Sequence, residues 1–230
     1  MPIHPAIDRP SADSREDVVR WIERDRAVAV VRTDAPHKLV EIAQALQVGG
    51  VVCIEVTMTV PNAIDGIRAV TEAMRGSVLV GAGSVTDAAT TRAAVEAGAR
   101  YVVSPVFKRE VVDAAHAEGA AVMPGCFTPT EILRAHEAGA DVVKVFPAGS
   151  LGPGFIKGVL APLPYLKLMP TGGVTLDNAG SWLRAGAVAV GAGSALVDES
   201  AIASGDWAQL TANAKRLRAS VDEAPRRDTV

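Results

Sequence analysis

Lys144 has the most unusual setting of any charged residue in this sequence. It lies inside the apolar, β-branched segment Asp141-Val142-Val143-Lys144-Val145-Phe146-Pro147, which is typical of a strand. Placing an ammonium in such a strand costs several kcal/mol unless the group is paired or neutral. A desolvated lysine with a depressed pKa is the nucleophile that forms a Schiff base with a carbonyl compound. The alternative is a lysine near a strand end whose ammonium reaches solvent, and its position alone does not separate the two interpretations.

Two more charged residues occupy comparable positions. Glu55 lies within the apolar run 51–56, and Arg32 directly follows the run 27–31. Successive side chains of a strand point to opposite faces, so turning the apolar neighbours of these residues toward the helices turns Glu55, Lys144 and Arg32 inward. They are therefore expected to converge on one cavity. A purely structural salt bridge between Glu55 and Lys144 is the competing interpretation.

Two glycine-containing segments could bind an anion. Thr171-Gly172-Gly173-Val174-Thr175 follows the seventh apolar run of the chain, and Gly191-Ala192-Gly193-Ser194 follows the eighth. Glycine allows backbone N–H groups to approach an anion closely, and a helix N-terminus adds a favourable partial charge. The pair predicts a phosphate site. A third segment, Gly81-Ala82-Gly83-Ser84, follows the third run and is expected to shape the floor of the cavity.

These residues need a scaffold that brings the ends of several strands together. Eight short apolar runs alternate with helical patterns, several of which end in glycine, as at Gly98, Gly139 and Gly186. This alternation predicts an α/β protein with a parallel sheet buried on both faces. We expect a single-domain (β/α)8 TIM barrel over 14–221 with an extra N-terminal helix, between loose tails at 1–13 and 222–230. A doubly wound open sheet is the alternative.

The expected strands are 27–31, 51–56, 78–81, 101–103, 121–123, 142–146, 167–169 and 188–191. The expected helices are 14–25, 36–48, 61–75, 86–97, 108–118, 129–138, 153–160, 175–185 and 204–220. In a (β/α)8 barrel the carboxyl ends of the strands form the active-site face, and the loops after strands seven and eight form the usual phosphate site. The predicted fold therefore collects the charged residues and the glycine segments at one end.

Composition narrows the function further. The net charge is −3 and no basic cluster occurs apart from Arg226-Arg227, so no nucleic-acid partner is expected. No apolar run has membrane-spanning length and the N-terminus lacks the features of a signal peptide, so we expect a cytoplasmic protein with no membrane partner. The isolated Cys53 and Cys126 indicate reduced thiols. Because no histidine stands at a strand end, no metal is expected.

Several motifs follow one another along the chain in an order that is known from one family. They are Ile54-Glu55-Val56-Thr57, Gly81-Ala82-Gly83-Ser84-Val85, Ser104-Pro105, Met123-Pro124-Gly125, Val143-Lys144-Val145-Phe146-Pro147 and Pro170-Thr171-Gly172-Gly173-Val174. With these motifs the chain resembles the 2-keto-3-deoxy-6-phosphogluconate (KDPG) and 4-hydroxy-2-oxoglutarate (KHG) aldolases over about residues 16–220. The resemblance implies a metal-independent class I aldolase on a (β/α)8 barrel, without a cofactor and assembled as a homotrimer.

The resemblance also implies roles for individual residues. Lys144 would be the Schiff-base lysine and Glu55 the general acid/base. Some members carry an arginine where this chain has Thr59, whereas others end the first strand with arginine, so Arg32 is the candidate for the substrate carboxylate. Ser84 stands where many members have threonine. The pyruvate pocket would comprise Thr57, Ser84, Pro105 and Phe146, and the phosphate site Thr171, Gly172, Gly173, Gly193 and Ser194.

The implied reaction is cleavage of KDPG to pyruvate and glyceraldehyde 3-phosphate, a step of the Entner–Doudoroff pathway, with cleavage of KHG to pyruvate and glyoxylate as a further activity. Glu55 would act as base and then as acid, so a raised pKa would help, although the Lys144 ammonium opposes that rise. The galactonate epimer of KDPG and oxaloacetate decarboxylation suit the same site. A non-catalytic barrel that binds a phosphosugar is the alternative outside enzymes.

Overall fold

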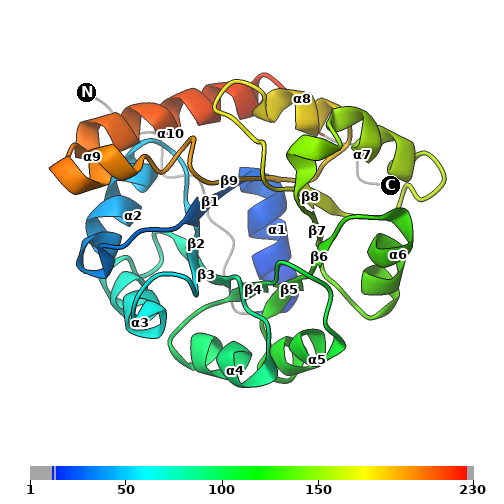
Figure 1. The fold of residues 1–230 in the computed structure, drawn as a ribbon, viewed down its shortest axis with the longest axis horizontal. Helices are drawn as coiled ribbons and strands as arrows, with labels where there is room; N and C mark the ends of the chain where they lie inside the picture. Colours follow the sequence, from blue (N-terminus) through cyan, green and yellow to red (C-terminus); the bar gives the residue numbers. More distant parts are fainter. Residues whose placement is uncertain (1–11, 13, 227–230) are drawn as a thin grey trace.

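The computed structural model describes Ala12 and residues 14–226, which form a ring of parallel strands surrounded by helices (Figure 1). Six strands pair in the order β5-β4-β3-β2-β1-β9, and three more in the order β6-β7-β8. The strand bounds are β1 Ala27–Val31, β2 Cys53–Thr57, β3 Leu79–Gly83, β4 Tyr101–Val103, β5 Ala121–Met123, β6 Gly125–Cys126, β7 Val143–Val145, β8 Leu168–Pro170 and β9 Val190–Ala192.

The two sheets join into one closed barrel. β5 and β6 belong to the same stretch of chain and are interrupted at Pro124, which has no N–H group to donate to a neighbouring strand. On the other side, a parallel bridge between Thr171 and Gly191 connects the ends of β8 and β9, and the Val188 N–H donates to the Leu168 carbonyl at 3.0 Å. The eight predicted strands are present, and the predicted (β/α)8 barrel is confirmed.

Helices follow the strands along the chain and cover the outer face of the barrel (Figure 1). Outward-facing residues such as Val56 and Val145 are fully buried beneath them, which explains why the strands read as almost continuous apolar runs. Within the described residues, no helix combines the length and the apolar character that crossing a membrane requires. The bounds are η1 Pro36–Lys38, α2 Leu39–Val48, α3 Ala63–Ala73, α4 Ala88–Glu96, α5 Arg109–Ala117, α6 Pro129–Glu137, η2 Ala148–Ser150, α7 Pro153–Leu160, α8 Ala179–Arg184, α9 Glu199–Ser204 and α10 Trp207–Asp222.

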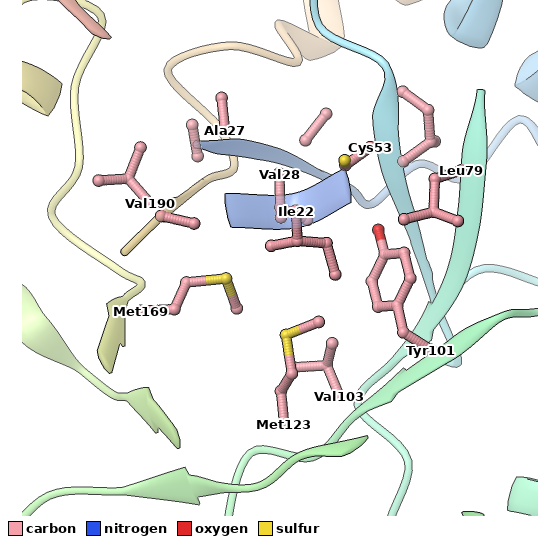
Figure 2. Packing of buried hydrophobic residues seen from close by; sticks show 14 of the residues in the cluster. Ile22, Ala27, Val28, Cys53, Leu79, Tyr101, Val103, Met123, Met169 and Val190 are labelled. Atoms are coloured by element: carbon pink, nitrogen blue, oxygen red, sulfur yellow. The ribbon is translucent and has the colours of Figure 1, made fainter. Parts of the chain in front are cut away.

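The predicted extra helix, α1 (Arg15–Asp25), closes the end of the barrel at which the strands begin. A capping box formed by Ser14 and Asp17 stabilises its first turn. Ion pairs join it to residues just before β7 and β8, Arg15 to Asp141 at 3.0 Å and Glu23 to Lys167 at 2.8 Å. Its buried face reaches the interior, where Ile22 lies among the strand side chains (Figure 2). The opposite end of the barrel remains for a functional site.

The helices differ from the prediction in two places. The helix expected at 204–220 is preceded by a separate helix, α9, and the two are divided by Gly205, whose φ of +73° ends α9. The helix expected at 175–185 begins only at Ala179, because Thr175 and Asn178 form hydrogen bonds with each other in the loop before it.

The segment after the barrel corrects the predicted C-terminal tail. α10 continues to Asp222, and Ala224 is buried. The buried guanidinium of Arg26 donates to the carbonyl oxygens of Ala224 at 2.9 Å and Pro225 at 3.3 Å. Residues 222–226 therefore pack against the barrel instead of forming a loose tail. The predictions for 1–11, 13 and 227–230 lie outside the described residues.

Candidate functional site

Glu55 is the middle residue of β2 and has no solvent exposure. Neither of its carboxylate oxygens has a hydrogen-bond partner among the described residues. Burial raises the pKa of the Glu55 carboxyl, while the positive charges of Lys144 and Arg32 act in the opposite direction. Such a carboxyl takes up and releases a proton at a higher pH than an ordinary glutamate, which suits a general acid/base.

Lys144 is the middle residue of β7 and is only 5% exposed. It stands in register with Met169, whose side chain points into the barrel in Figure 2, so Lys144 points inward as well. Its Nζ lies 5.1 Å from the centre of the Phe146 ring. Among the described residues, no ion pair within 4.0 Å joins Lys144 to Glu55, so the salt bridge considered from the sequence is not formed.

Two glycines of β3 make room inside the barrel. A Cβ atom at Gly83 would lie 2.0 Å from Glu55 Oε1, and one at Gly81 would lie 2.3 Å from the ring of Tyr101. Glu55 therefore fills the space beside Gly83, and Tyr101 fills the space one layer deeper. Within the described part of the chain, Tyr101 is the largest fully buried side chain, and its hydroxyl points toward Cys53 in Figure 2. The expected floor of the cavity is thus made by a ring that sequence reasoning did not single out.

Arg32 and Thr57 lie at the open end of the barrel. Arg32 is exposed, yet it is close enough to Glu55 for its charge to affect that carboxyl. The Thr57 hydroxyl is buried and donates to the Val31 carbonyl at 3.2 Å, so the hydroxyl of Thr59, 2.8 Å away, is the donor between the two threonines. Because its proton is already used, the Thr57 hydroxyl joins the ends of β1 and β2 and has no proton left to donate to an anion.

Three further predicted residues surround this end. Ser84 follows β3 with φ of +59°, a conformation that is uncommon for residues other than glycine and recurs at functional sites. Phe146 lies beside Lys144 and is 37% exposed. Pro105 approaches Gly125, the register partner of Lys144, so closely that a Cβ at Gly125 would lie 2.3 Å from the Pro105 carbonyl oxygen. Pro105 and Phe146 therefore border the lysine.

The predicted phosphate residues are also brought together, since the ends of β8 and β9 meet at the Thr171–Gly191 bridge. The N–H groups of Gly173, Gly193 and Ser194 have no hydrogen-bond partner within the described residues, whereas the Gly172 N–H faces the Gly191 carbonyl across the bridge. The Thr171 N–H, in contrast, donates to the Val145 carbonyl at 2.9 Å, so Thr171 can offer only its buried, unpartnered hydroxyl.

The prediction that helix N-termini add a favourable partial charge at these loops is wrong. α8 begins at Ala179 and α9 at Glu199, several residues after the glycine segments. The donors available to an anion are therefore amides of the loops themselves. Among Ala12 and residues 14–226, no group of three or more His, Cys, Asp and Glu side chains is arranged to hold a metal ion.

A buried inward lysine, a buried carboxyl without a hydrogen bond and free loop amides are the groups that a Schiff-base enzyme acting on a phosphorylated carbonyl compound requires. Comparison with known proteins agrees with this class. A family model described as KDPG and KHG aldolase matches residues 18–213. The chain belongs to the KDPG and KHG aldolase family.

Individual relatives span most of the chain. A 2-dehydro-3-deoxy-phosphogluconate aldolase of Treponema pallidum is 38% identical over 192 residues, which are 83% of this chain and 91% of that protein. A 2-dehydro-3-deoxy-6-phosphogalactonate aldolase of Escherichia coli is 32% identical over 179 residues, 77% of this chain and 87% of that protein. The KDPG aldolase of Legionella pneumophila, solved with pyruvate captured at low pH as a covalent carbinolamine intermediate, is 27% identical, with a TM-score of 0.81 over 86% of this chain and 97% of that one.

Proposed function

We propose that this protein is a class I aldolase that cleaves KDPG to pyruvate and glyceraldehyde 3-phosphate. The observation that carries the proposal is the placement of Lys144 and Glu55, which point into the same end of one barrel without forming an ion pair. Membership of the aldolase family supports the reaction type. The covalent pyruvate intermediate of the Legionella pneumophila relative supports lysine chemistry.

The proposed reaction begins when the Lys144 amine attacks the C2 ketone of the substrate, and loss of water from the carbinolamine gives an iminium. Glu55, directly or through a water molecule, accepts the proton of the C4 hydroxyl. The C3–C4 bond then breaks, its electron pair moves toward the iminium, and the aldehyde leaves. The remaining enamine of pyruvate is protonated at C3, with Glu55 returning the proton. Hydrolysis of the iminium frees pyruvate and regenerates Lys144.

The surrounding residues have binding roles in this proposal. Arg32 supplies a free positive charge for the substrate carboxylate, and Phe146, Pro105, Ser84 and Thr57 enclose the pyruvate end. The phosphate is held by the Thr171 hydroxyl, the Ser194 side chain and the free amides of the two glycine loops. Three free N–H groups, those of Gly173, Gly193 and Ser194, favour a phosphorylated substrate over KHG.

The galactonate epimer of KDPG is the second candidate substrate, because a 2-dehydro-3-deoxy-6-phosphogalactonate aldolase is among the relatives. The epimers differ at C4, where Glu55 acts, so both can use the same lysine. KHG cleavage and oxaloacetate decarboxylation remain side activities of the same iminium chemistry. Comparing kcat/KM for KDPG, its galactonate epimer and KHG ranks these substrates, and binding of KDPG without turnover would favour a phosphosugar-binding protein instead.

We further propose a homotrimer that works in the cytoplasm, in the Entner–Doudoroff pathway. An exposed apolar surface supports self-association: Val106, Phe127 and Phe146 are 49%, 40% and 37% exposed, and they line one hollow with Pro105 and Phe107. Because Phe146 also lies beside Lys144, a second copy on this surface would shield the site from water. Light scattering of the wild type and of Phe127→Glu tests the assembly.

Reductive trapping tests the chemistry directly. Borohydride added with pyruvate should reduce the iminium and leave a stable adduct on Lys144, which peptide mass spectrometry locates. Lys144→Ala should lose the adduct and nearly all turnover. An unmodified Lys144 in a protein that still cleaves KDPG would rule out the class I mechanism.

A further inference from the structure

Three successive carbonyl groups of the glycine loop after β8 each accept a hydrogen bond. The Thr171 carbonyl accepts from the Ala148 N–H at 2.9 Å, and the Gly172 carbonyl accepts from the Gly149 N–H at 2.7 Å. The Gly173 carbonyl accepts from a side chain instead, the Nδ2 amide of Asn178, at 3.0 Å. Each carbonyl in this loop therefore has a fixed direction.

A fixed carbonyl also fixes an N–H group. The peptide bonds at this loop are planar and trans, so the N–H of each peptide unit points away from its C=O. The N–H groups of Gly172, Gly173 and Val174 are consequently turned away from the groups that hold the carbonyls. The Gly172 N–H faces the Gly191 carbonyl across the Thr171–Gly191 bridge, but neither the Gly173 N–H nor the Val174 N–H has a hydrogen-bond partner among the described residues, although Val174 is only 5% exposed. Backbone N–H groups in such buried residues are almost always paired, so the unpaired Val174 N–H is a candidate donor to a ligand.

We infer that Asn178 is a positioning residue for phosphate. By holding the Gly173 carbonyl, it turns the Val174 N–H toward the anion, as a further donor beside the amides of the glycine loops. This inference rests on the proposed phosphorylated substrate. It adds to the predicted phosphate residues one donor, Val174, and one support that touches no substrate atom. Amide donors aimed at an anion make charge-assisted hydrogen bonds, which are the strong ones.

Asn178 also has an ordinary structural role, from which the positioning role must be separated. Its Oδ1 accepts from the Thr175 N–H at 2.8 Å, and its own N–H donates to the Thr175 hydroxyl at 3.2 Å. This reciprocal pair stabilises the turn before α8 without involving Gly173. Thr175→Val removes part of that pair and leaves the bond from Asn178 to Gly173 in place, so it is the matched control.

The experiment measures steady-state kinetics of the full chain with KDPG and with unphosphorylated KHG, and competitive inhibition of KDPG cleavage by inorganic phosphate. Asn178→Ala should raise the KM for KDPG and the inhibition constant of phosphate about tenfold, the loss expected for one hydrogen bond to a charged group. Its kcat with KDPG should stay near the wild-type value, because the reacting carbons lie away from the phosphoryl group. Its kcat/KM with KHG should also stay near the wild-type value, because KHG has no phosphoryl group. Thr175→Val should leave phosphate affinity unchanged.

Asn178→Asp is the second variant, since it retains the acceptor for Thr175 and loses the donor to Gly173. It too should lower the affinity for phosphate and raise the KM for KDPG, while the kcat/KM for KHG stays unchanged. Unchanged phosphate affinity in Asn178→Ala, or an equal loss in Thr175→Val, would overturn the positioning role. If the wild type cleaves none of these substrates, the affinity of inorganic phosphate for the wild type and for Asn178→Ala, measured by calorimetry, still tests the role of Asn178. The proposed reaction and this inference can therefore fail separately.

Discussion

Gly83→Ala displaces the Glu55 carboxyl without changing its chemistry. The new Cβ would lie 2.0 Å from Oε1, 2.6 Å from Cδ and 2.7 Å from Cγ of Glu55, whereas ordinary contact begins at 3.4 Å. The carboxyl oxygen must therefore move by about 1.4 Å, the difference between 3.4 and 2.0 Å. Gly83 does not have a positive φ, so its backbone accepts alanine and the effect falls on Glu55.

The expected result is a loss of kcat of about 100-fold, because a misplacement of about 1 Å in a reacting group costs on that order. This corresponds to about 2.7 kcal/mol in the activation barrier and lies within the range of about 10²–10⁴ for removing a general acid/base entirely. Overpacking should also lower the free energy of unfolding by about 1–3 kcal/mol. The borohydride adduct on Lys144 should still form, since the lysine is unchanged.

Pyruvate release coupled to lactate dehydrogenase measures kcat and KM, and denaturant unfolding measures stability. Gly158→Ala is the control: a Cβ at that position in α7 meets nothing within 4 Å, so kcat should stay unchanged and stability should rise by about 0.5–1 kcal/mol. A folded Gly83→Ala protein with wild-type kcat would refute the assignment of Glu55 in this position as the group that transfers the proton.

The remaining predictions concern three buried titratable groups. Because burial raises the pKa of Glu55, kcat should fall on acidification at a higher pH than for an ordinary glutamate. The stability that the protonated carboxyl contributes is fully present below the unfolded pKa of about 4.5 and is lost as pH rises through the folded pKa. The free energy of unfolding of Glu55→Gln should therefore increase relative to that of the wild type as pH rises over that window. Burial raises the pKa of Cys126 to about 12, so iodoacetamide at pH 8 should label this thiol far more slowly than a free cysteine; rapid labelling in the folded protein would contradict the packing shown here. Tyr101→Phe should leave stability nearly unchanged, because the buried hydroxyl has no hydrogen-bond partner among the described residues, whereas Tyr101→Ala should cost about 3–5 kcal/mol in urea unfolding. Equal losses in the two Tyr101 variants would show that the hydroxyl is bonded in solution.

Local sequence patterns were sufficient for most of the strands and for the direction of their charged side chains. β1, β4 and β5 begin and end where the apolar runs do. Glu55 and Lys144 point inward as alternation predicts, because a two-residue period along a strand is a local property. The helices were less predictable near α8 and α9, since hydrogen bonds between loop residues, such as Thr175 and Asn178, shorten a pattern that would otherwise continue.

Two further features of the site are indicated by residue spacing in the sequence. Gly81 and Gly83 are two residues apart on one strand, so both face inward, and two missing side chains imply that larger neighbours fill the space. Thr175 and Asn178 have the spacing of a capping box, which marks a turn and not a helix interior. Neither signal could name Tyr101 or the Gly173 carbonyl as the partner, because those contacts join different parts of the chain.

The sequence by itself therefore determined the alternation of strands and helices, the inward direction of Lys144 and Glu55, and the family resemblance, all of which depend on neighbouring residues and their spacing. The tertiary structure alone decided that Glu55 and Lys144 form no ion pair, that the ring of Tyr101 lies beneath Glu55, and that loop amides, without help from a helix N-terminus, are the donors available to an anion. The physical reason is that closing the barrel sets the stagger between strands distant in sequence. That stagger determines which inward side chains fill which space.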